Sequence, residues 1–373
     1  MNVLYVNHTD VVSGGERSLL DMLGALPPQV RPLLATPAGG LMAAAEQLSI
    51  PVTPIRGTAG SLRLHPWHTP MALADLSIAA AQVRRATRRH RAALVHANSI
   101  RAGLELALAR LPVSTVVHVR DCLPPGRASS TTMRAIAASA TTVIANSCYT
   151  ADCIRAIAPR ARVRVLYNAV DLERFDPERI DRERARDALG VGGQRLLLGV
   201  VAQLTPWKGQ DTAVEALRLL VAQGLDAHLL LIGSAKFVAS ATRLDNRSYV
   251  TGLQARVKEA GLDDRVSWLG EREDVPELIR ALDVLLMPSW EEPFGRSLIE
   301  AMALEVPVVS TNVGGPAEIL EDGREGRLVA PGEPRAWAEA VRMIAEDPHR
   351  AAAMGAAGRR RAGPALRSRN CRS

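Results

Sequence analysis

Short runs of apolar and β-branched residues alternate with helix-like stretches along almost all of this 373-residue chain. In the first half the apolar runs are Val3–Val6, Val30–Ala35, Ala93–His96, Thr115–Val119, Thr142–Ala145 and Arg162–Leu166. In the second half they are Arg195–Ala202, His228–Ile232, Val266–Leu269, Val284–Met287, Pro307–Ser310 and Gly326–Val329. Helix-like stretches such as Glu16–Leu26, Leu73–His90 and Arg101–Leu111 lie between them. Because such alternation is typical of parallel sheets covered by helices on both faces, the sequence predicts an α/β protein.

A polar, charged stretch at residues 171–194 separates the two series of runs. A chain of this length can form about two domains. We therefore expect one Rossmann-like domain at residues 1–170, a linker at 171–194 and a second Rossmann-like domain at 195–361. The last residues, 362–373, contain few apolar side chains and are expected to be disordered. Ligands of such sheets bind beyond the carboxyl ends of the strands.

The composition narrows the classes of partner. A net charge of +7 is compatible with nucleic acid, a membrane surface or an anionic substrate. Aromatic residues make up only 3% and form no stacking cluster, so we expect no nucleic-acid partner. No apolar run approaches the roughly 20 residues of a membrane span, and the N-terminus lacks the pattern of a leader peptide. The sequence therefore predicts a cytoplasmic protein. The arginine run Arg84–Arg91 predicts a solvated helix face. Peripheral contact of this run with the inner face of the membrane is the open alternative.

The segment Trp290–Val309 contains two glutamates eight residues apart. Glu292 lies in a Pro/Gly loop after a buried strand, and Glu300 lies inside a helix that starts at about Gly295. Free backbone amides at a helix start attract an anion, and nearby carboxylates can accept hydrogen bonds from sugar hydroxyls. Together they suggest a nucleotide sugar as the ligand. The alternative is that Glu292 caps the helix and Glu300 is a solvated helix residue.

This segment resembles the E-x7-E signature of retaining GT-B glycosyltransferases, particularly glycosyltransferase family 4. The matching parts are Glu292, Phe294, Gly295, Glu300, Ala301 and Ala303, the strand Val306–Ser310, and then Gly314, Gly315 and Glu318. The resemblance implies a GT-B fold, with two Rossmann-like domains facing across a cleft. It also implies an acceptor-binding first domain and a donor-binding second domain. In the family pattern Glu300 holds the ribose, Glu292 and the Phe294–Gly295 backbone hold the sugar, and Ser297 lies in the same donor site.

A lysine and a glycine follow the first strand of the second domain. Lys208 and Gly209 lie just before a helix, and the resemblance makes Lys208 the contact to the donor diphosphate. The family has an arginine where this chain has Gln203, which removes one charge from the expected diphosphate site. Alone, this pattern would also fit a surface lysine beside a glycine turn.

Two features of the first domain complete the predicted site. Gly14 and Gly15 are expected in a turn before a helix, and they resemble the family's glycine loop near the donor phosphate. His118 lies at the end of a buried strand, where the family carries a histidine near the reacting carbon. A satisfied core histidine is the alternative.

These resemblances imply an enzyme that transfers a sugar from a nucleotide diphosphate sugar to an acceptor hydroxyl. We expect His118 and Glu292 in catalytic roles, no metal because no D-x-D motif occurs, and no cofactor beyond the donor substrate. The acceptor would be a glycan, a lipid or a small molecule. A nucleotide-sugar epimerase of the same fold remains an alternative, and so does a degenerate, inactive transferase, suggested by Gln203 and the short C-terminus.

Overall fold

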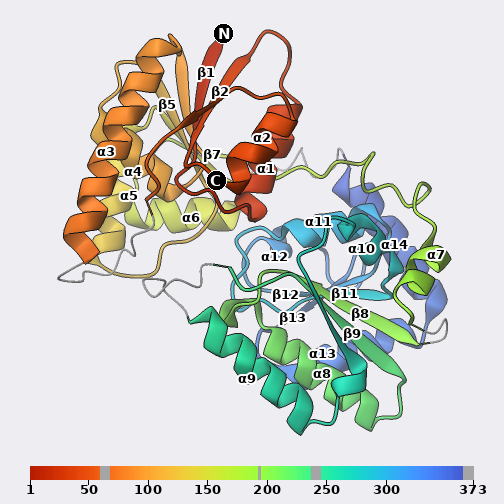
Figure 1. Cartoon of the computed structure of the whole chain (residues 1–373). Coiled ribbons are helices and arrows are strands. Elements are labelled where there is room, and N and C mark those ends of the chain that lie inside the picture. The colour runs from red at the N-terminus through yellow and green to blue at the C-terminus, as the bar shows by residue number, and fades with distance from the viewer. Residues whose placement is uncertain (59–67, 192–194, 237–244, 364–373) are drawn as a thin grey trace. The chain divides into compact units, whose positions relative to one another are not determined.

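A computed structural model describes residues 1–58, 68–191, 195–236 and 245–363 of the chain. The described residues divide into two compact units, 1–168 and 169–363. Each unit contains one parallel β-sheet with helices packed on it (Figure 1). The two units are described separately below.

Unit 1 is built on a seven-stranded parallel sheet with the strand order β3-β2-β1-β4-β5-β6-β7. The strands are β1 (Asn2–Val6), β2 (Arg31–Thr36), β3 (Val52–Pro54), β4 (Leu94–Ala97), β5 (Ser114–Val119), β6 (Thr142–Ala145) and β7 (Val163–Val165). The helices are α1 (Gly14–Gly24), α2 (Gly40–Gln47), α3 (His68–Arg89), α4 (Ile100–Ala109), α5 (Arg127–Ser139) and α6 (Cys148–Ile157).

Successive side chains of a strand point to opposite faces of the sheet, and here both sets are apolar. In β1, Leu4 and Val6 pack in a core with residues of α3, α4, α5 and α6. Val3 and Tyr5 point the other way, into a smaller core with residues of α1 and α2. Burial on both faces explains why the strands are continuous apolar runs.

Unit 2 is built on a six-stranded parallel sheet with the order β10-β9-β8-β11-β12-β13. The strands are β8 (Leu196–Val201), β9 (Ala227–Ile232), β10 (Val266–Gly270), β11 (Val284–Met287), β12 (Val308–Thr311) and β13 (Arg327–Val329). The α-helices are α7 (Arg182–Ala188), α8 (Gln210–Ala222), α9 (Asn246–Glu259), α10 (Val275–Ala281), α11 (Arg296–Ala303), α12 (Pro316–Ile319), α13 (Pro334–Ala345) and α14 (Pro348–Ala362). The described part of the unit also contains the 3-10 turns η1 (Pro206–Lys208) and η2 (Asp263–Arg265).

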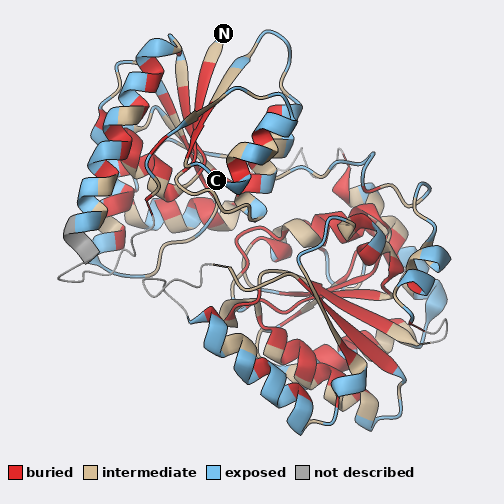
Figure 2. Cartoon of the chain, viewed as in Figure 1, coloured by how far each residue is buried: buried red, intermediate tan, exposed pale blue. Residues whose placement is uncertain are grey.

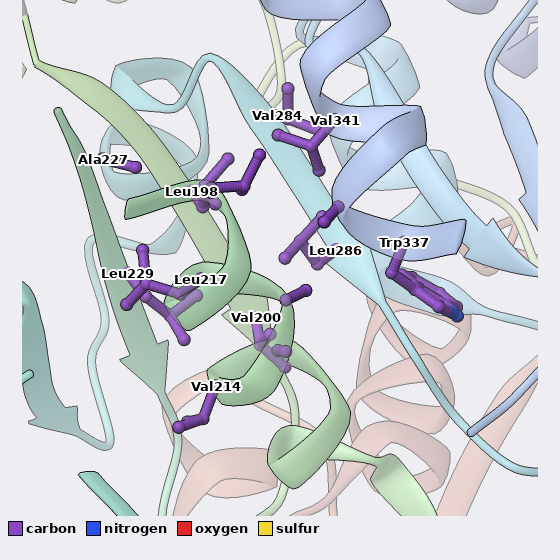
Figure 3. Packing of buried hydrophobic residues seen from close by; sticks show 14 of the residues in the cluster. Leu198, Val200, Val214, Leu217, Ala227, Leu229, Val284, Leu286, Trp337 and Val341 are labelled. Carbon is purple, nitrogen blue, oxygen red and sulfur yellow. The ribbon is translucent and has the colours of Figure 1, made fainter. Parts of the chain in front are cut away.

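One core of unit 2 lies between the sheet and helices α8, α9 and α13. Leu198 and Leu286 of the central strands meet Leu217 of α8 and Trp337 of α13 in this core (Figure 3). The central strands of both sheets are mostly buried, whereas the outer helix faces are exposed (Figure 2). This packing fixes the positions at which the central strands end and the loops at their carboxyl ends begin.

The predicted strands agree with the structure to within two residues at each end, and β6 and β11 have the predicted bounds. The expected linker at 171–194 contains α7, which packs on α10 within unit 2. Arg186 of α7 is buried and pairs with Asp283, with Nη1 3.1 Å from Oδ2. The charged stretch thus contributes to the second unit. The predicted disordered tail lies outside the described residues from 364 onward, and α14 ends at Ala362.

The described helices include none that is both long enough and apolar enough to span a membrane.

Candidate active site

The strand order of unit 2 reverses between β8 and β11, which lie side by side at the centre of the sheet (Figure 1). The loops that follow these two strands meet at the carboxyl edge, where α/β sheets bind ligands. The backbone N–H of Trp290 donates to the carbonyl of Trp207 at 2.9 Å and joins the two loops. Lys208 lies in the first loop and Glu292 in the second, so the predicted donor residues meet at this switch point.

Lys208 and Glu292 form an ion pair, with Nζ 2.5 Å from Oε2. Their side chains are only 16% and 9% exposed. The hydroxyl of Ser289 donates to the same Oε2 at 3.0 Å. The ring of Trp207 lies under the ammonium, with its centroid 4.1 Å from Nζ, a cation–π distance. The ammonium therefore lies against both a carboxylate and an aromatic face.

Two glycines allow this arrangement. Gly209 has a φ of +69°, and a Cβ there would lie 2.0 Å from the carbonyl oxygen of Pro288. Gly295 has a φ of +99°, and a Cβ there would lie 2.9 Å from Cε of Met287. Both residues therefore need the left-handed conformation and the missing side chain.

Helix α11 begins at Arg296, as the sequence predicts, with Gly295 as its N-cap and no side-chain cap. The helix-cap alternative for Glu292 is wrong, because its carboxylate binds Lys208 and Ser289. The N-cap position of α11 thus provides no side-chain cap, and the helix starts directly after the loop that contains Glu292.

Glu300 lies in the second turn of α11 and is only 7% exposed, so the alternative of a solvated residue is wrong. Arg296 Nε donates to Glu300 Oε1 at 2.7 Å. Phe294 is buried, and the hydroxyl of Ser297 donates to the sulfur of Met287 at 3.8 Å. The sequence reasoning missed Arg296; its spacing of four residues from Glu300 on one helix is the signal that could have found it.

Gln203 lies at the end of β8 and is tied to the backbone. Its side-chain Nε2 donates to the carbonyl of Lys236 at 3.2 Å, and its own carbonyl accepts from Gln210 Nε2 at 2.8 Å. Its amide thus orders the loop after β8 and carries no charge.

Replacing Gln203 with arginine is expected to tighten the binding of a nucleoside diphosphate by about 1.5–3 kcal/mol, because it adds a charge-assisted contact beside Lys208. The gain should shrink as salt is added. Calorimetric titration with UDP at low and high salt measures both effects. Gln203→Met is the matched control, since it removes the bond to Lys236 without adding charge. Equal or weaker binding of the arginine variant at low salt would contradict the prediction.

In unit 1, Gly14 and Gly15 lie inside the first turn of α1, whose N-cap is Ser13. The expectation of a turn before the helix is wrong at these two positions. Ser13 and Glu16 explain the earlier start, because Glu16 Oε2 accepts from the Ser13 backbone N–H at 3.2 Å and from its hydroxyl at 2.5 Å. This capping box between Ser13 and Glu16 starts the helix at Gly14. A Cβ on Gly15 would lie 3.2 Å from Cδ of Arg120.

His118 lies in β5 and is 4% exposed. Its ring stacks on His96, with centroids 5.8 Å apart, and its Nδ1 accepts from Arg120 Nη2 at 3.3 Å. Burial lowers the pKa of His118 well below its ordinary value, and Arg120 and His96 lower it further. The ring is therefore neutral at pH 7, with its proton on Nε2. The hydrogen bond at Nδ1 orients Arg120.

Arg120 was missed as a site residue by the sequence reasoning. It follows β5 directly, and its Nε and Nη2 donate to Asn98 Oδ1 at 3.2 and 3.1 Å. Its Nη1 donates to Asn168 Oδ1 at 2.8 Å. Asn98 follows β4, so both residues occupy carboxyl ends of neighbouring strands. The position of a polar residue right after a buried strand is the signal that could have found them.

Two family models match the chain. The model described as "Glycosyl transferases group 1" matches residues 181–361, and the model described as "Glycosyltransferase Family 4" matches residues 12–174. The chain belongs to the family 4, group 1 glycosyltransferases. The resemblance read from the E-x7-E segment is therefore confirmed.

Relatives of this glycosyltransferase family member include two curated proteins. This chain is 32% identical over 196 residues to the lipopolysaccharide core biosynthesis mannosyltransferase LpsB of Rhizobium meliloti. The match covers 52% of this chain and 54% of the relative. The chain is 34% identical over 232 residues to the D-inositol 3-phosphate glycosyltransferase of Streptomyces avermitilis, which covers 61% of this chain and 49% of the relative. The matches thus span about half the length of these curated relatives.

The structure is also similar to the crystal structure of Anabaena Alr3699/HepE in complex with UDP-glucose. The two share 28% identity with a TM-score of 0.82, over 98% of this chain and 95% of the other. This likeness and the two parallel sheets identify the fold as GT-B.

Proposed function

We propose that the chain is a retaining glycosyltransferase that moves a sugar from a nucleotide diphosphate sugar to an acceptor hydroxyl. The Lys208–Glu292 pair at the switch point of unit 2 carries the proposal. It places a cation suited to phosphate and a carboxylate suited to hydroxyls side by side at the edge where such sheets bind ligands. A complex of HepE with UDP-glucose supports the same donor chemistry.

Each residue of the site has a chemical role in this proposal. Lys208 and the amides at the start of α11 hold the diphosphate, because both offer positive charge to an anion. Glu292 and the Phe294–Gly295 backbone hold hydroxyls of the transferred sugar. Glu300, kept in place by Arg296, accepts hydrogen bonds from the ribose hydroxyls. The two carboxylates thus recognise opposite ends of the donor.

The reaction exchanges one carbon–oxygen bond for another. The acceptor oxygen bonds to the anomeric carbon on the face from which the diphosphate leaves, so the configuration is retained. The bond between that carbon and the phosphate oxygen breaks, and the acceptor proton passes to the leaving phosphate. Lys208 and the start of α11 stabilise the charge that develops on the phosphate. In this proposal His118, which is neutral and buried, positions the guanidinium of Arg120 through their hydrogen bond.

The proposal specifies the acceptor by its chemical class. The relatives' names point to saccharide and inositol phosphate acceptors, so a glycan, a glycolipid or a small polyol is expected. A glycolipid among these acceptors would be met at a membrane surface. The basic end of α3, where Arg84, Arg85, Arg88 and Arg89 are exposed, offers a peripheral contact with anionic lipid.

A thermal-shift screen of UDP, GDP, ADP and dTDP sugars tests the donor class, because a ligand that binds only the folded state raises the melting temperature. The stabilising donor is then incubated with and without candidate acceptors, and the products are read by NMR. Retained anomeric configuration in an acceptor-dependent product supports the proposal. Epimerised or hydrolysed donor without acceptor would favour the epimerase, and no stabilisation by any donor would favour an inactive protein.

Turnover is expected to survive EDTA, because Lys208 and the start of α11 supply the charge that a metal would otherwise provide. Initial rates are compared in chelator, in buffer alone and with added magnesium or manganese. A rate that falls in EDTA and recovers with either metal would contradict the metal-free mechanism.

A further inference from the structure

The ammonium of Lys208 and the carboxylate of Glu292 are each other's partners in this structure, yet the proposed function assigns them to different parts of the donor. Nζ of Lys208 lies 2.5 Å from Oε2 of Glu292, and Ser289 donates to that same oxygen at 3.0 Å. Both side chains are largely removed from solvent. A donor that takes both must therefore replace a direct ion pair.

The backbone around the pair leaves this exchange to the side chains. The two loops are joined by the Trp290–Trp207 hydrogen bond at 2.9 Å. The carbonyl of Glu292 accepts from the N–H of Gly315 at 2.8 Å, which ties the second loop to the start of α12. Gly209 packs closely on the carbonyl of Pro288, since a Cβ at this position would lie 2.0 Å from that oxygen. Lysine has four rotatable side-chain bonds and three N–H donors, so its ammonium can turn from the carboxylate toward a phosphate.

An intact nucleotide sugar and a free nucleoside diphosphate differ in what they offer to this pair. Both present a diphosphate, which competes with Glu292 for Lys208. Only the nucleotide sugar also presents hydroxyls, which can donate to Glu292 in place of the ammonium. With the free diphosphate, the buried carboxylate would lose its cation and face an anion. Like charges in a site of low dielectric repel strongly.

We propose that the Lys208–Glu292 pair discriminates between donor and product: it opens fully only for a nucleotide sugar and closes again once the sugar has been transferred, which drives out the nucleoside diphosphate. Glu292 thus has two roles, as a sugar-binding group and as the group that limits product retention. This inference rests on the proposed function of the site.

The test compares affinities for UDP and UDP-glucose, measured by calorimetry on the full chain and on Glu292→Gln. If the donor screen selects another nucleotide, that nucleotide and its sugar replace the two probes. The glutamine keeps the shape of the side chain and removes its charge. We expect UDP to bind at least about threefold more tightly to the variant, because the repulsion is gone, and UDP-glucose to bind more weakly, because charged hydrogen bonds to the sugar are lost. The ratio of the two affinities should shift by about tenfold or more.

Two further variants make the result specific. Glu291→Gln removes the same charge one residue away and should leave the affinity ratio near that of the unchanged protein. Lys208→Met combined with Glu292→Gln should lose the gain in UDP affinity, since the freed ammonium is absent. A matching gain in Glu291→Gln would show general electrostatics and overturn the proposal.

The failure of this inference is distinct from the failure of the proposed function. If the unchanged protein binds UDP and UDP-glucose while Glu292→Gln binds UDP no more tightly, the discrimination by the ion pair is refuted and the donor site stands. If the unchanged protein binds no nucleoside diphosphate and no nucleotide sugar, the donor site itself is refuted.

Discussion

Replacing Lys208 with methionine is expected to weaken nucleoside diphosphate binding by about 1.5–3 kcal/mol, or roughly 10- to 150-fold, because a charge-assisted contact to phosphate is lost. Turnover should fall at least as far, since the same ammonium stabilises the leaving diphosphate. The variant should also be less stable. Its Glu292 side chain, 9% exposed, keeps the hydroxyl of Ser289 and loses its cation.

Stability and binding can be separated with a matched double variant. Lys208→Met with Glu292→Gln removes the unpaired carboxylate, so the melting temperature should recover while UDP affinity stays low. Lys208→Arg keeps the charge and tests whether a point charge is enough. Calorimetry and thermal unfolding measure the two properties. UDP affinity in Lys208→Met equal to that of the unchanged protein, with the fold intact, would remove Lys208 from the diphosphate site.

Unit 1 is expected to lose stability between about pH 6.5 and 3, because it buries imidazoles that are neutral in the folded state. Burial lowers the pKa of His8 and of His96 to about 3 each, with smaller contributions from Arg101 and Arg120 respectively. The pKa of His118 is lowered in the same way. Below pH 6.5 these histidines take up protons in the unfolded chain and not in the folded one. Acid therefore favours unfolding.

Glu105 opposes this effect over the upper part of this range. Burial raises its pKa to about 7, so below pH 7 the folded state holds a proton on Glu105 that the unfolded state lacks until about pH 4.5. In this range the three histidines bind about three more protons in the unfolded chain, and Glu105 binds about one more in the folded chain. The unfolded chain therefore binds about two more protons in total, and the free energy of unfolding falls by about 3 kcal/mol per pH unit. Below pH 4.5 the opposing contribution of Glu105 ends.

Urea unfolding at several pH values tests this expectation. Circular dichroism follows the whole chain, whereas tryptophan fluorescence reports mainly on unit 2, which holds Trp207, Trp268, Trp290 and Trp337. The circular dichroism transition should move to lower urea ahead of the fluorescence transition as the pH falls. His96→Gln removes one titrating group and should reduce the slope by about 1.4 kcal/mol per pH unit. Two transitions that shift together would contradict an origin in unit 1.

The local pattern of the sequence accounts for most of the secondary structure. Strand β11 and the start of α11 fall where the apolar run and the glycine predict them, because hydrophobic periodicity and backbone freedom act over a few residues. The two glycines before Glu16 were misplaced for a similar local reason. A lone Gly-Gly suggests a turn, but the capping box between Ser13 and Glu16 places both inside α1. Residues 171–194 looked like a linker because α7 is charged, although Arg186 is buried against Asp283.

The sequence by itself determined the fold class, the family, and Lys208, Glu292 and Glu300 as candidate donor residues. Only the tertiary structure decided which side chains are partners. Lys208 and Glu292 are 84 residues apart, and Arg120 reaches Asn98 and Asn168 across 22 and 48 residues. Periodicity along a chain specifies local conformation and the buried face of each element, but it does not specify the order of strands in a sheet. Because that order brings β8 beside β11 and β4 beside β5, it alone determines which loops meet and therefore which charges pair.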